Sequence, residues 1–437
     1  MLRGINKARA DDAYRLLQCL TVAVRPPYVS ELAELLAFDF QASSSKGIPV
    51  LKEDWRWDDQ EEAVLSTCSS LISIVNDDCG LLRVQFSHFS VKEYLVSSRL
   101  AQSPHGDVSR FHIDLESAHT IMAQACLGTL LRSDEKTGDS EADESPLLEY
   151  AARHWLDHAQ FENVSSCVWD GIDDLFDSSK PHFAAWLQVH DMDEDWGSFS
   201  TSKEGHFVSP LYYAAFCGFH DLAERLITKH PDQVNARGGR ILAPLPAALY
   251  KKHFCLANLL HKHGADVHCR GADEVTPLHS ASIDGSVDVM RWLLNHGADA
   301  NARSKYDRAP LQWAARYAYI DCVQVLLDHN ANINVQSYDG ETPLYWTTEW
   351  KGEHTLDTAR RLLEHGADPN ICSNRHSTPL HEASSRGSLE VVRLLLSYGA
   401  KVDAKDDDGS TSFQVAASEG HHEITKLLLE HGAVPPL

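Results

Sequence analysis

The 437-residue sequence predicts a mostly α-helical fold in which a solenoid of about seven short repeats follows a smaller mixed domain and a helical bridge. Three observations predict it. A unit of about 33 residues recurs from Ser209 onward, and each unit holds two short stretches with apolar residues at helical spacing. The first hundred residues instead combine helical patterns with one alternating, strand-like segment. A period of this length indicates stacked units that bury a continuous core against their neighbours.

Changes in the spacing of apolar residues and in composition along the chain predict two domain boundaries. We assign residues 1–105 to a winged-helix-like domain, 106–200 to a helical bridge and 201–437 to the repeat domain. Inside the bridge, residues 133–144 (SDEKTGDSEADE) are acidic and poor in apolar side chains. We interpret them as a solvated linker, with an acidic recognition segment as the alternative.

The winged-helix-like domain is expected because three helical patterns precede a strand pattern and a last helix. The predicted helices cover 11–24, 29–38, 61–75 and 90–100, with a long connection at 39–60 and a strand at 82–86. The strand follows the turn-forming run from Asn76 to Gly80 and alternates apolar and polar residues.

The bridge is predicted to be helical as well. Helices are expected at 116–131, from Ser145 to Ala159, at 164–176 and from Pro181 to His190. Ser145 suits an N-cap and Pro146 the first helical position, where no amide donor is needed. We expect this block to cover the apolar side of the first repeat near Ser209, because the end of a solenoid needs a cap.

The stretch 276–301, TPLHSASIDGSVDVMRWLLNHGADAN, shows how one repeat folds. Thr276 suits an N-cap and Pro277 the first helical position. Gly285 is expected to end the first helix, and Gly297 to adopt the left-handed conformation after the second. The equivalents of Thr276 recur at intervals of 33 to 36 residues: Ser209, Ala243, Ala309, Thr342, Thr378 and Thr411.

These motifs identify the repeat. T-P-L-H-x-A at 276–281, T-P-L-H-E-A at 378–383 and the LLxxGAD signatures around Gly297 and Gly366 resemble the ankyrin repeat. The resemblance covers roughly half of the chain, and it implies an elongated array of helix pairs joined by hairpins.

A second resemblance covers roughly the first quarter of the chain. The segment V-Q-F-S-H-F-S-V-K-E-Y-L at 84–95, with VLSTCSSLISIV at 64–75, is similar to the winged-helix region that follows the nucleotide-binding domain of fungal NACHT-type STAND ATPases, which often end in ankyrin repeats. The runs at 145–160 and 180–187 resemble the bridge of the same family.

That resemblance implies a role for one histidine. In the family, the histidine at the position of His88 reaches a phosphate of bound ADP. No Gly-Lys-Ser or Gly-Lys-Thr occurs in this sequence, so the loop that cradles the phosphates is missing. His88 is therefore expected to be a structural polar residue, and an ADP contact only if a nucleotide-binding domain is supplied elsewhere.

Composition narrows the class of partner. The formal net charge of −24 argues against nucleic acid and anionic membrane surfaces and favours a neutral or basic protein. The longest apolar run is too short to span a bilayer, and no secretory leader is found. The ten cysteines are scattered without a C-x-x-C pair, which predicts reduced thiols in the cytoplasm, with the nucleus as the alternative.

No catalytic constellation is found, so we predict no enzyme activity, no cofactor, no metal and no small-molecule ligand. The sequence has neither a G-x-S-x-G nucleophile elbow nor a G-x-G-x-x-G fingerprint. Histidines are frequent, but they fall at helix ends and helix-opening turns of the repeats, where the fold explains them. They are His261, His263 and His268 beside Cys269, and the pair His421 and His422.

Candidate binding residues are those that vary between repeats. Aromatic side chains stand four residues after the helix-opening position in three repeats, at Tyr213, Trp313 and Trp346. Trp, Tyr and Arg concentrate binding energy when they are desolvated. Further candidates are Tyr250, Arg316, Tyr317 and Trp350 near the inner helices, and Tyr306, Arg308 and Tyr338 at the hairpin tips. We expect the binding centre on repeats four and five; the alternative is that these rings only pack between inner helices.

Three functions remain open from the sequence. The first is a non-enzymatic adaptor or sensor that binds a protein on the concave surface of its repeats. The second is the regulatory or sensing part of a nucleotide-controlled STAND-type switch. The third is a DNA-binding regulator that uses the winged helix, against which the acidic charge argues.

Overall fold

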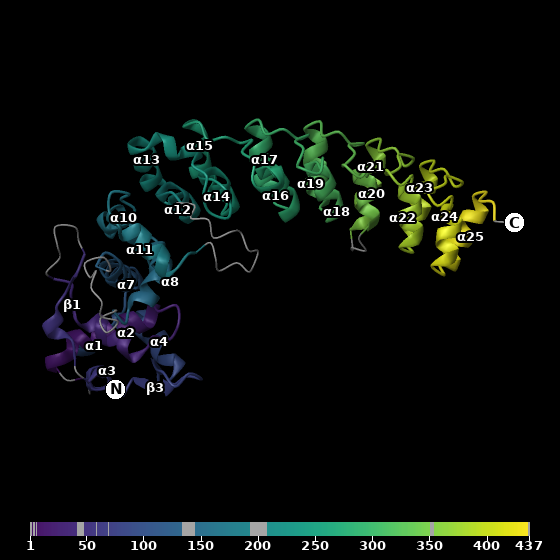
Figure 1. Cartoon of the computed structure of the whole chain (residues 1–437). Helices are drawn as coiled ribbons and strands as arrows, with labels where there is room; N and C mark the ends of the chain where they lie inside the picture. Colours follow the sequence, from purple (N-terminus) through teal and green to yellow (C-terminus); the bar gives the residue numbers. More distant parts are fainter. Residues whose placement is uncertain are drawn as a thin grey trace. The chain divides into compact units, whose positions relative to one another are not determined.

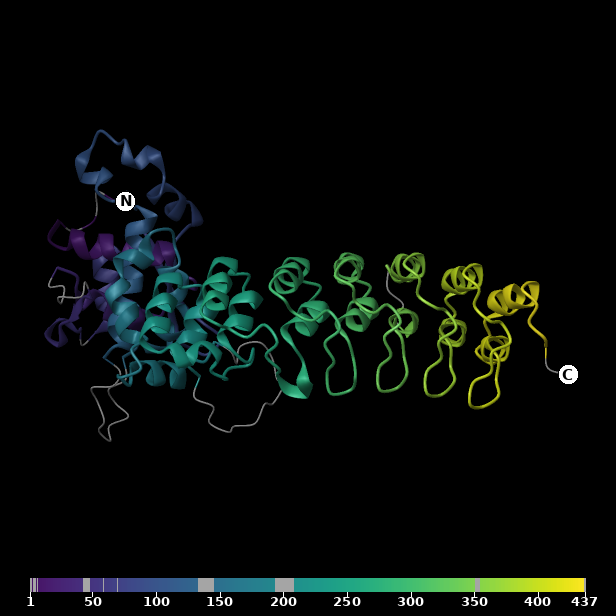
Figure 2. The same ribbon diagram turned by 90° about the horizontal axis from the view of Figure 1, so that it is seen from above.

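The computed structural model of the chain describes residues 2, 5, 7–41, 48–57, 59–68, 70–132, 145–192, 208–349 and 354–435. The predicted acidic linker at 133–144 and the candidate Trp350 lie outside the described residues. The chain divides into two compact units, Met1–Glu204 and Gly205–Leu437. Each unit is shown in Figures 1 and 2.

The first unit begins with a small domain of helices and two-stranded sheets. Its strands pair antiparallel, β1 (Phe38–Asp39) with β2 (Val50–Leu51) and β3 (Ile72–Asn76) with β4 (Leu82–Phe86). Its helical elements are η2 (Lys7–Arg9), α1 (Ala10–Val22), α2 (Val29–Leu36), η3 (Glu53–Trp55), α3 (Gln60–Cys68), α4 (Phe89–Leu95), α5 (Ser98–Ala101) and α6 (Gly106–Ser109).

The prediction of a third helix over residues 61–75 is wrong for the residues after Cys68. Helix α3 ends at Cys68, and the next residues form β3, whose Ile74 pairs with Val84 of β4. The β-branched Ile72, Ile74 and Val75 favour a strand once a partner strand is available. That partner is reached by a tight turn in which Gly80 adopts a φ of 80°. The predicted connection at 39–60 also contains β2 and η3.

The rest of the first unit is the helical bridge. It consists of α7 (Leu115–Leu130), α8 (Leu148–Ala159), α9 (Val164–Cys167), α10 (Trp169–Leu175) and α11 (His182–Val189). Helix α7 packs on both α8 and α1. Helix α8 begins at Leu148 and not at Pro146, since residues 146–147 form a turn in which the Leu148 amide donates to the Ser145 carbonyl at 2.9 Å. The Ser145 hydroxyl accepts from the Leu147 amide at 3.4 Å and donates to Glu34 Oε1 at 3.1 Å.

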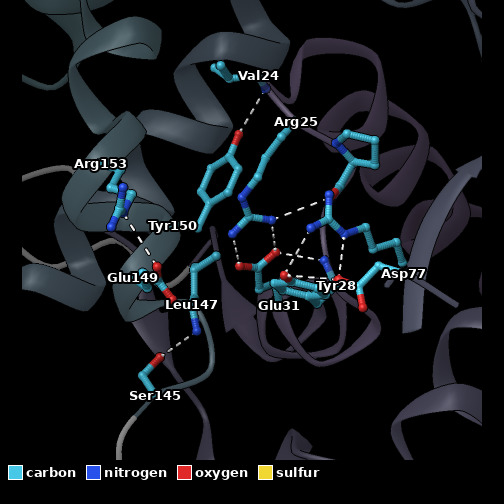
Figure 3. Close-up of polar contacts among 12 residues, drawn as sticks. Val24, Arg25, Tyr28, Glu31, Asp77, Ser145, Leu147, Glu149, Tyr150 and Arg153 are labelled. Carbon is cyan, nitrogen blue, oxygen red and sulfur yellow. Dashed lines mark hydrogen bonds and ion pairs between the residues drawn. The ribbon is translucent and has the colours of Figure 1, made fainter. Parts of the chain in front are cut away.

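A buried polar network joins the winged-helix region to the bridge (Figure 3). The Glu31 carboxylate, only 2 % exposed, accepts two hydrogen bonds from the Arg25 guanidinium and one from the Tyr28 amide at 2.7 Å. The same guanidinium lies over the ring of Tyr150 on α8, whose hydroxyl accepts from the Val24 amide at 3.2 Å. A buried carboxylate is tolerated only when paired in this way, so the network fixes α8 against the start of α2.

The Tyr150 hydroxyl is also hydrogen-bonded to His158 Nε2 at 3.0 Å, and His158 Nδ1 lies 3.0 Å from His119 Nδ1. Burial, and then the neighbouring His119, lower the pKa of His158 to about 3. The imidazole is therefore neutral at physiological pH and serves as a hydrogen-bonding element of the core.

The second unit is an array of seven helix pairs in the described residues. Figure 2 shows the pairs in a row, with the connecting hairpin loops of the later repeats projecting from one side. The inner and outer helices are α12 (Pro210–Cys217) and α13 (His220–Lys229), α14 (Pro244–Tyr250) and α15 (Phe254–Lys262), α16 (Pro277–Asp284) and α17 (Val287–Asn295), α18 (Pro310–Arg316) and α19 (Ile320–Asp328), α20 (Pro343–Glu349) and α21 (Thr355–Glu364), α22 (Pro379–Ser385) and α23 (Leu389–Ser397), and α24 (Ser412–Ser418) and α25 (His422–Glu430). The connections after α13 and α15 contain the short η5 (Pro231–Asn235) and η6 (Ala272–Glu274).

The repeat register predicted from the sequence is confirmed. Thr276 is the N-cap of α16, and Gly285 closes that helix in the left-handed conformation with a φ of 68°. Gly297 follows α17 with a φ of 91°. The leucine after each helix-opening proline is at most 1 % exposed: Leu211, Leu245, Leu278, Leu311, Leu344 and Leu380. These leucines fill the core between neighbouring inner helices.

One side chain in the first turn of several inner helices links successive repeats. His279 Nδ1 faces the Thr276 amide at 3.2 Å, while Nε2 lies 2.8 Å from the carbonyl of Arg308 in the next hairpin. A carbonyl can only accept, so Nε2 carries the proton and Nδ1 accepts. Burial lowers the pKa of His279, which keeps the ring in this neutral form. His381 repeats the arrangement toward Ser410, and its pKa is lowered for the same reason.

Gln312 makes the same link with an amide. Its Oε1 accepts from the Ala309 amide at 2.8 Å, and its Nε2 donates to the Glu341 carbonyl at 2.7 Å. The fourth repeat therefore shows that glutamine can replace histidine at this position without loss of either hydrogen bond.

We expect Leu380→Ala to lower the free energy of unfolding of the second unit by about 2 to 5 kcal/mol, because the side chain is fully buried between inner helices. The matched control is Leu429→Ala, since Leu429 on α25 is 45 % exposed and should change stability little. Urea melts followed by circular dichroism measure both. Equal losses for the two variants would contradict the register.

We also expect the double variant His279→Gln/His381→Gln to flatten the pH dependence of stability. Both folded-state pKa values are below the unfolded value of about 6.5, so the unfolded chain binds protons first as the pH falls. The stability contributed by neutral histidine is present above pH 6.5 and is lost progressively below it, by at most about 1.4 kcal/mol per pH unit and histidine.

Urea melts at pH 7.5, 6.5 and 5.5 test this expectation. The parent should lose more stability than the glutamine variant between the two lower values. An identical pH dependence in both proteins would show that the two linking histidines do not titrate in this range.

Candidate protein-binding surface

The structure separates the predicted binding residues by exposure. Tyr250, Tyr306, Tyr317 and Tyr338 are exposed, whereas Arg308, Trp313 and Arg316 are half-buried. Tyr213 has no exposed surface, and Trp346 retains only 1 %. These two rings are packing residues in this structure, because each fills space against its neighbours instead of facing solvent.

Six of the predicted residues come together on repeats four and five. We call them the aromatic–arginine cluster: Tyr306, Arg308, Trp313, Arg316, Tyr317 and Trp346. The Trp313 and Trp346 rings meet edge to face, with centroids 5.3 Å apart and an interplanar angle of 88°. Tyr317 continues the group, its ring stacked toward Trp313 at 6.2 Å.

Two arginines lie against these rings. The Arg308 guanidinium is 5.1 Å from the Tyr306 centroid, 5.5 Å from Trp313 and 5.4 Å from Trp346. Arg316 lies 5.9 Å from Trp313 and 5.3 Å from Trp346. A guanidinium stacks favourably on an aromatic face because the ring quadrupole is negative there. Each arginine is thus held by the rings, which limits its conformational freedom before any partner binds.

The repeat architecture positions the cluster. Trp313 and Arg316 stand one turn apart on α18, and Trp346 occupies the equivalent position of Trp313 on the neighbouring helix α20. Arg308 immediately precedes the N-cap residue Ala309, where its backbone is fixed by the hydrogen bond from His279. The Trp346 indole donates to Glu341 Oε2 at 2.8 Å.

Two donors in the cluster remain without an acceptor among the described residues. They are the buried Nε of Arg308 and Nε1 of Trp313. A buried donor without a partner lowers stability, so the two donors are exceptions that call for an explanation.

The other predicted residues lie outside the cluster. Tyr213 packs edge to face on Tyr212 at 5.2 Å inside the first repeat. Tyr250 is at the end of α14 in the second repeat, beside Lys251. Tyr338 is at the next hairpin tip, where its amide donates to the Tyr306 carbonyl at 3.0 Å, so the two tips are adjacent.

Sequence reasoning missed two members of this surface. Tyr319 is exposed, and its ring lies 6.0 Å from Tyr317 and against Gly285 of the preceding repeat. His253 and His421 contact Gly218 and Gly387 in the same way, so an aromatic residue about 34 positions after a helix-ending glycine was a usable signal. Glu341 was missed because nothing in its local sequence indicates that it accepts from Trp346.

His88 lies far along the chain from this surface, in the winged-helix region. It is the exposed N-cap residue of α4, where Nδ1 accepts from the Ser90 amide at 3.2 Å and lies 2.7 Å from the Ser90 hydroxyl. Its ring contacts that of Phe89 at 4.5 Å. The local role of His88 is therefore to cap a helix.

Comparisons with known proteins agree with this architecture. Residues 245–337, 335–406 and 350–436 match the family described as ankyrin repeats (3 copies). Residues 1–106 match the winged helix domain of GPI inositol-deacylase. The chain therefore contains ankyrin repeats and, at its N-terminal end, a winged helix domain of that type. Helix α12 precedes the matched residues but is capped like the inner helix α16, with Ser209 as N-cap, proline at the first position and the left-handed Gly218 as C-cap.

A curated relative also matches. It is azaphilone pigments biosynthesis cluster protein L of Monascus ruber, 29 % identical over 272 residues, which are 58 % of this chain and 55 % of that protein. The chain thus spans about half the length of this curated relative.

Neither a membrane span nor a metal site is found in the part of the chain that the structure describes. Among the described residues, no helix combines the length and apolar character that a bilayer span requires. No group of three or more His, Cys, Asp or Glu side chains among them could hold a metal ion.

We expect Trp346→Ala to destabilise the second unit by about 3 to 5 kcal/mol, because it empties a buried site between α18 and α20. Trp313→Ala should cost clearly less, since that ring is half-buried and faces solvent in part. Thermal melts of the two single variants measure the difference. A Trp346→Ala protein that melts with the parent would mean that this ring does not support the repeats.

Proposed function

We propose that this protein is a non-enzymatic binding module, acting as an adaptor or sensor, that holds a partner protein on the aromatic–arginine cluster of repeats four and five. The observation that carries the proposal is that exposed Tyr306 and Tyr317 flank two half-buried arginines on rigid tryptophan rings. Tyr and Arg on a fixed support lose little entropy on binding and dominate the energetics of protein interfaces.

The same observations assign different roles within the cluster. Trp346 is a support, because its indole is buried and hydrogen-bonded to Glu341. Tyr306, Tyr317 and the adjacent tip residue Tyr338 present surface to a partner. We place this activity in the cytoplasm or nucleus, where repeats with free cysteines are stable.

The proposal predicts that Tyr306→Ala/Tyr317→Ala loses its partner while remaining folded. The tagged full chain is purified from its source organism, and proteins retained by the parent are compared with those retained by the variant. Each tyrosine anchor should contribute about 2 kcal/mol, so binding should fall by more than tenfold.

Tyr398→Ala is the matched control, because Tyr398 at the end of α23 is similarly exposed but outside the cluster. It should retain the partner. If the double variant and the control retain the same proteins equally well, the binding surface is elsewhere on the chain.

A second candidate function is the sensing part of a STAND-type switch. It is favoured by the exposed apolar side chains of the winged helix around the capping residue His88, namely Phe89 at 71 % and Tyr94 at 40 % exposure. Exposed aromatic side chains of this kind suit contact with another domain. An in-frame phosphate-binding loop in the coding region upstream of Met1 would support this function.

For this chain we expect no stoichiometric ADP binding in isothermal titration calorimetry, because the sequence has no Gly-Lys-Ser/Thr loop. His88→Ala should only weaken the start of α4, by about 0.5 to 2 kcal/mol. Tight ADP binding that disappears in His88→Ala would instead show that this histidine contacts nucleotide.

A further inference from the structure

The aromatic–arginine cluster differs in charge from the chain that carries it. The formal net charge of the chain is −24. The Trp346 indole is nevertheless contacted by two cations, Arg308 and Arg316, and by one carboxylate, Glu341. Two guanidinium groups against one ring repel each other, and an anion placed between them relieves that repulsion.

Arg308 has unused capacity for such an anion. It forms no ion pair within the described residues, and because its Nε is buried, an incoming carboxylate would meet the two terminal amino groups of the guanidinium. A guanidinium offers five N–H donors in a planar fork that fits a carboxylate. Because Tyr306, Trp313 and Trp346 already hold the fork in place, a partner carboxylate would find it preorganised.

The net negative charge of the chain limits which anionic ligands can bind the cluster, because the other acidic residues repel a long anion. At physiological ionic strength the Debye length is about 8 Å, so a short ligand senses mainly the charges next to it. A nucleic acid would extend beyond the two arginines and meet the negative charge of the remaining chain. A short peptide segment would not, which favours a peptide over a nucleic acid.

We infer that the cluster recognises a short acidic segment of the partner protein. Asp or Glu carboxylates of that segment bind Arg308 and Arg316, and a neighbouring apolar side chain packs on Tyr306 and Tyr317. This inference rests on the proposed function and specifies its partner. The total charge of the chain favours a neutral or basic partner. We infer an acidic segment instead, because the two arginines make the cluster positive although the chain as a whole is negative.

The probe is a phage-displayed library of random 16-residue peptides, selected on the full chain and on Arg308→Gln/Arg316→Gln. Peptides from the parent should be enriched in Asp and Glu next to apolar residues, and the double variant should lose that enrichment. For one selected peptide, fluorescence anisotropy should show a Kd about tenfold or more weaker for the double variant. Arg393→Gln, an exposed arginine on the outer helix α23, should bind like the parent.

Two further measurements separate loss of charge from loss of folding. Arg308→Lys/Arg316→Lys keeps both charges and should retain the acidic preference with reduced affinity. Binding of the selected peptide by the parent should weaken as salt rises. Selected peptides that are neutral or basic, an absence of selected peptides, or binding unaffected by the glutamine substitutions would overturn the inference.

Binding of the natural partner by the two double variants distinguishes a failure of this inference from a failure of the proposed function. If Tyr306→Ala/Tyr317→Ala loses the natural partner while Arg308→Gln/Arg316→Gln keeps it, the surface binds a protein but not through its arginines. If neither double variant loses the partner, the proposed surface itself is wrong.

Discussion

The repeat array depends on a hydrogen bond that leaves one repeat and ends on the next, at the junctions after the third, fourth and sixth repeats. The residue at the third position of the inner helix caps its own helix and donates to a hairpin carbonyl of the following repeat, as His279, Gln312 and His381 do. This bond fixes the distance between an inner helix and the next hairpin. Since a solenoid is stabilised only by contacts between neighbours, this one side chain sets the geometry of the three junctions at which it occurs.

The cluster follows from that geometry. Because the hairpin carbonyl of Arg308 is held by His279, the arginine side chain leaves the backbone at a fixed point and reaches rings from α18 and α20. The core leucine is the same in the first six repeats and is replaced by Phe413 in the seventh, whereas the positions beside it vary. The binding residues that we propose are therefore side chains whose replacement leaves the stacking of the repeats intact, with Trp346 as the exception.

Much of this could be predicted from the sequence because the signals were local and repeated. Thr276, Pro277 and Gly285 each encode a backbone conformation, and seven copies fixed the register. The exposure of Trp346 could not be predicted, since it depends on how closely α18 approaches α20. Ile72 to Val75 were assigned to a helix because their strand conformation requires β4 as a partner. The start of α8 was placed too early because Ser145 and Pro146 open a turn before the helix, in which the Leu148 amide donates to the Ser145 carbonyl.

The linking residues also differ in chemistry along the array. The links that start from the third and sixth repeats are imidazoles, but the link from the fourth repeat, which supports the loop carrying Glu341, is the amide of Gln312. An amide has no proton to gain in mild acid. Acidification therefore acts on the junction of repeats three and four, where His279 holds the Arg308 carbonyl, and on the junction of repeats six and seven, but spares the link between repeats four and five. The packing of α18 against α20, which brings Trp313 and Trp346 together, is thus the part of the cluster whose link does not titrate in mild acid.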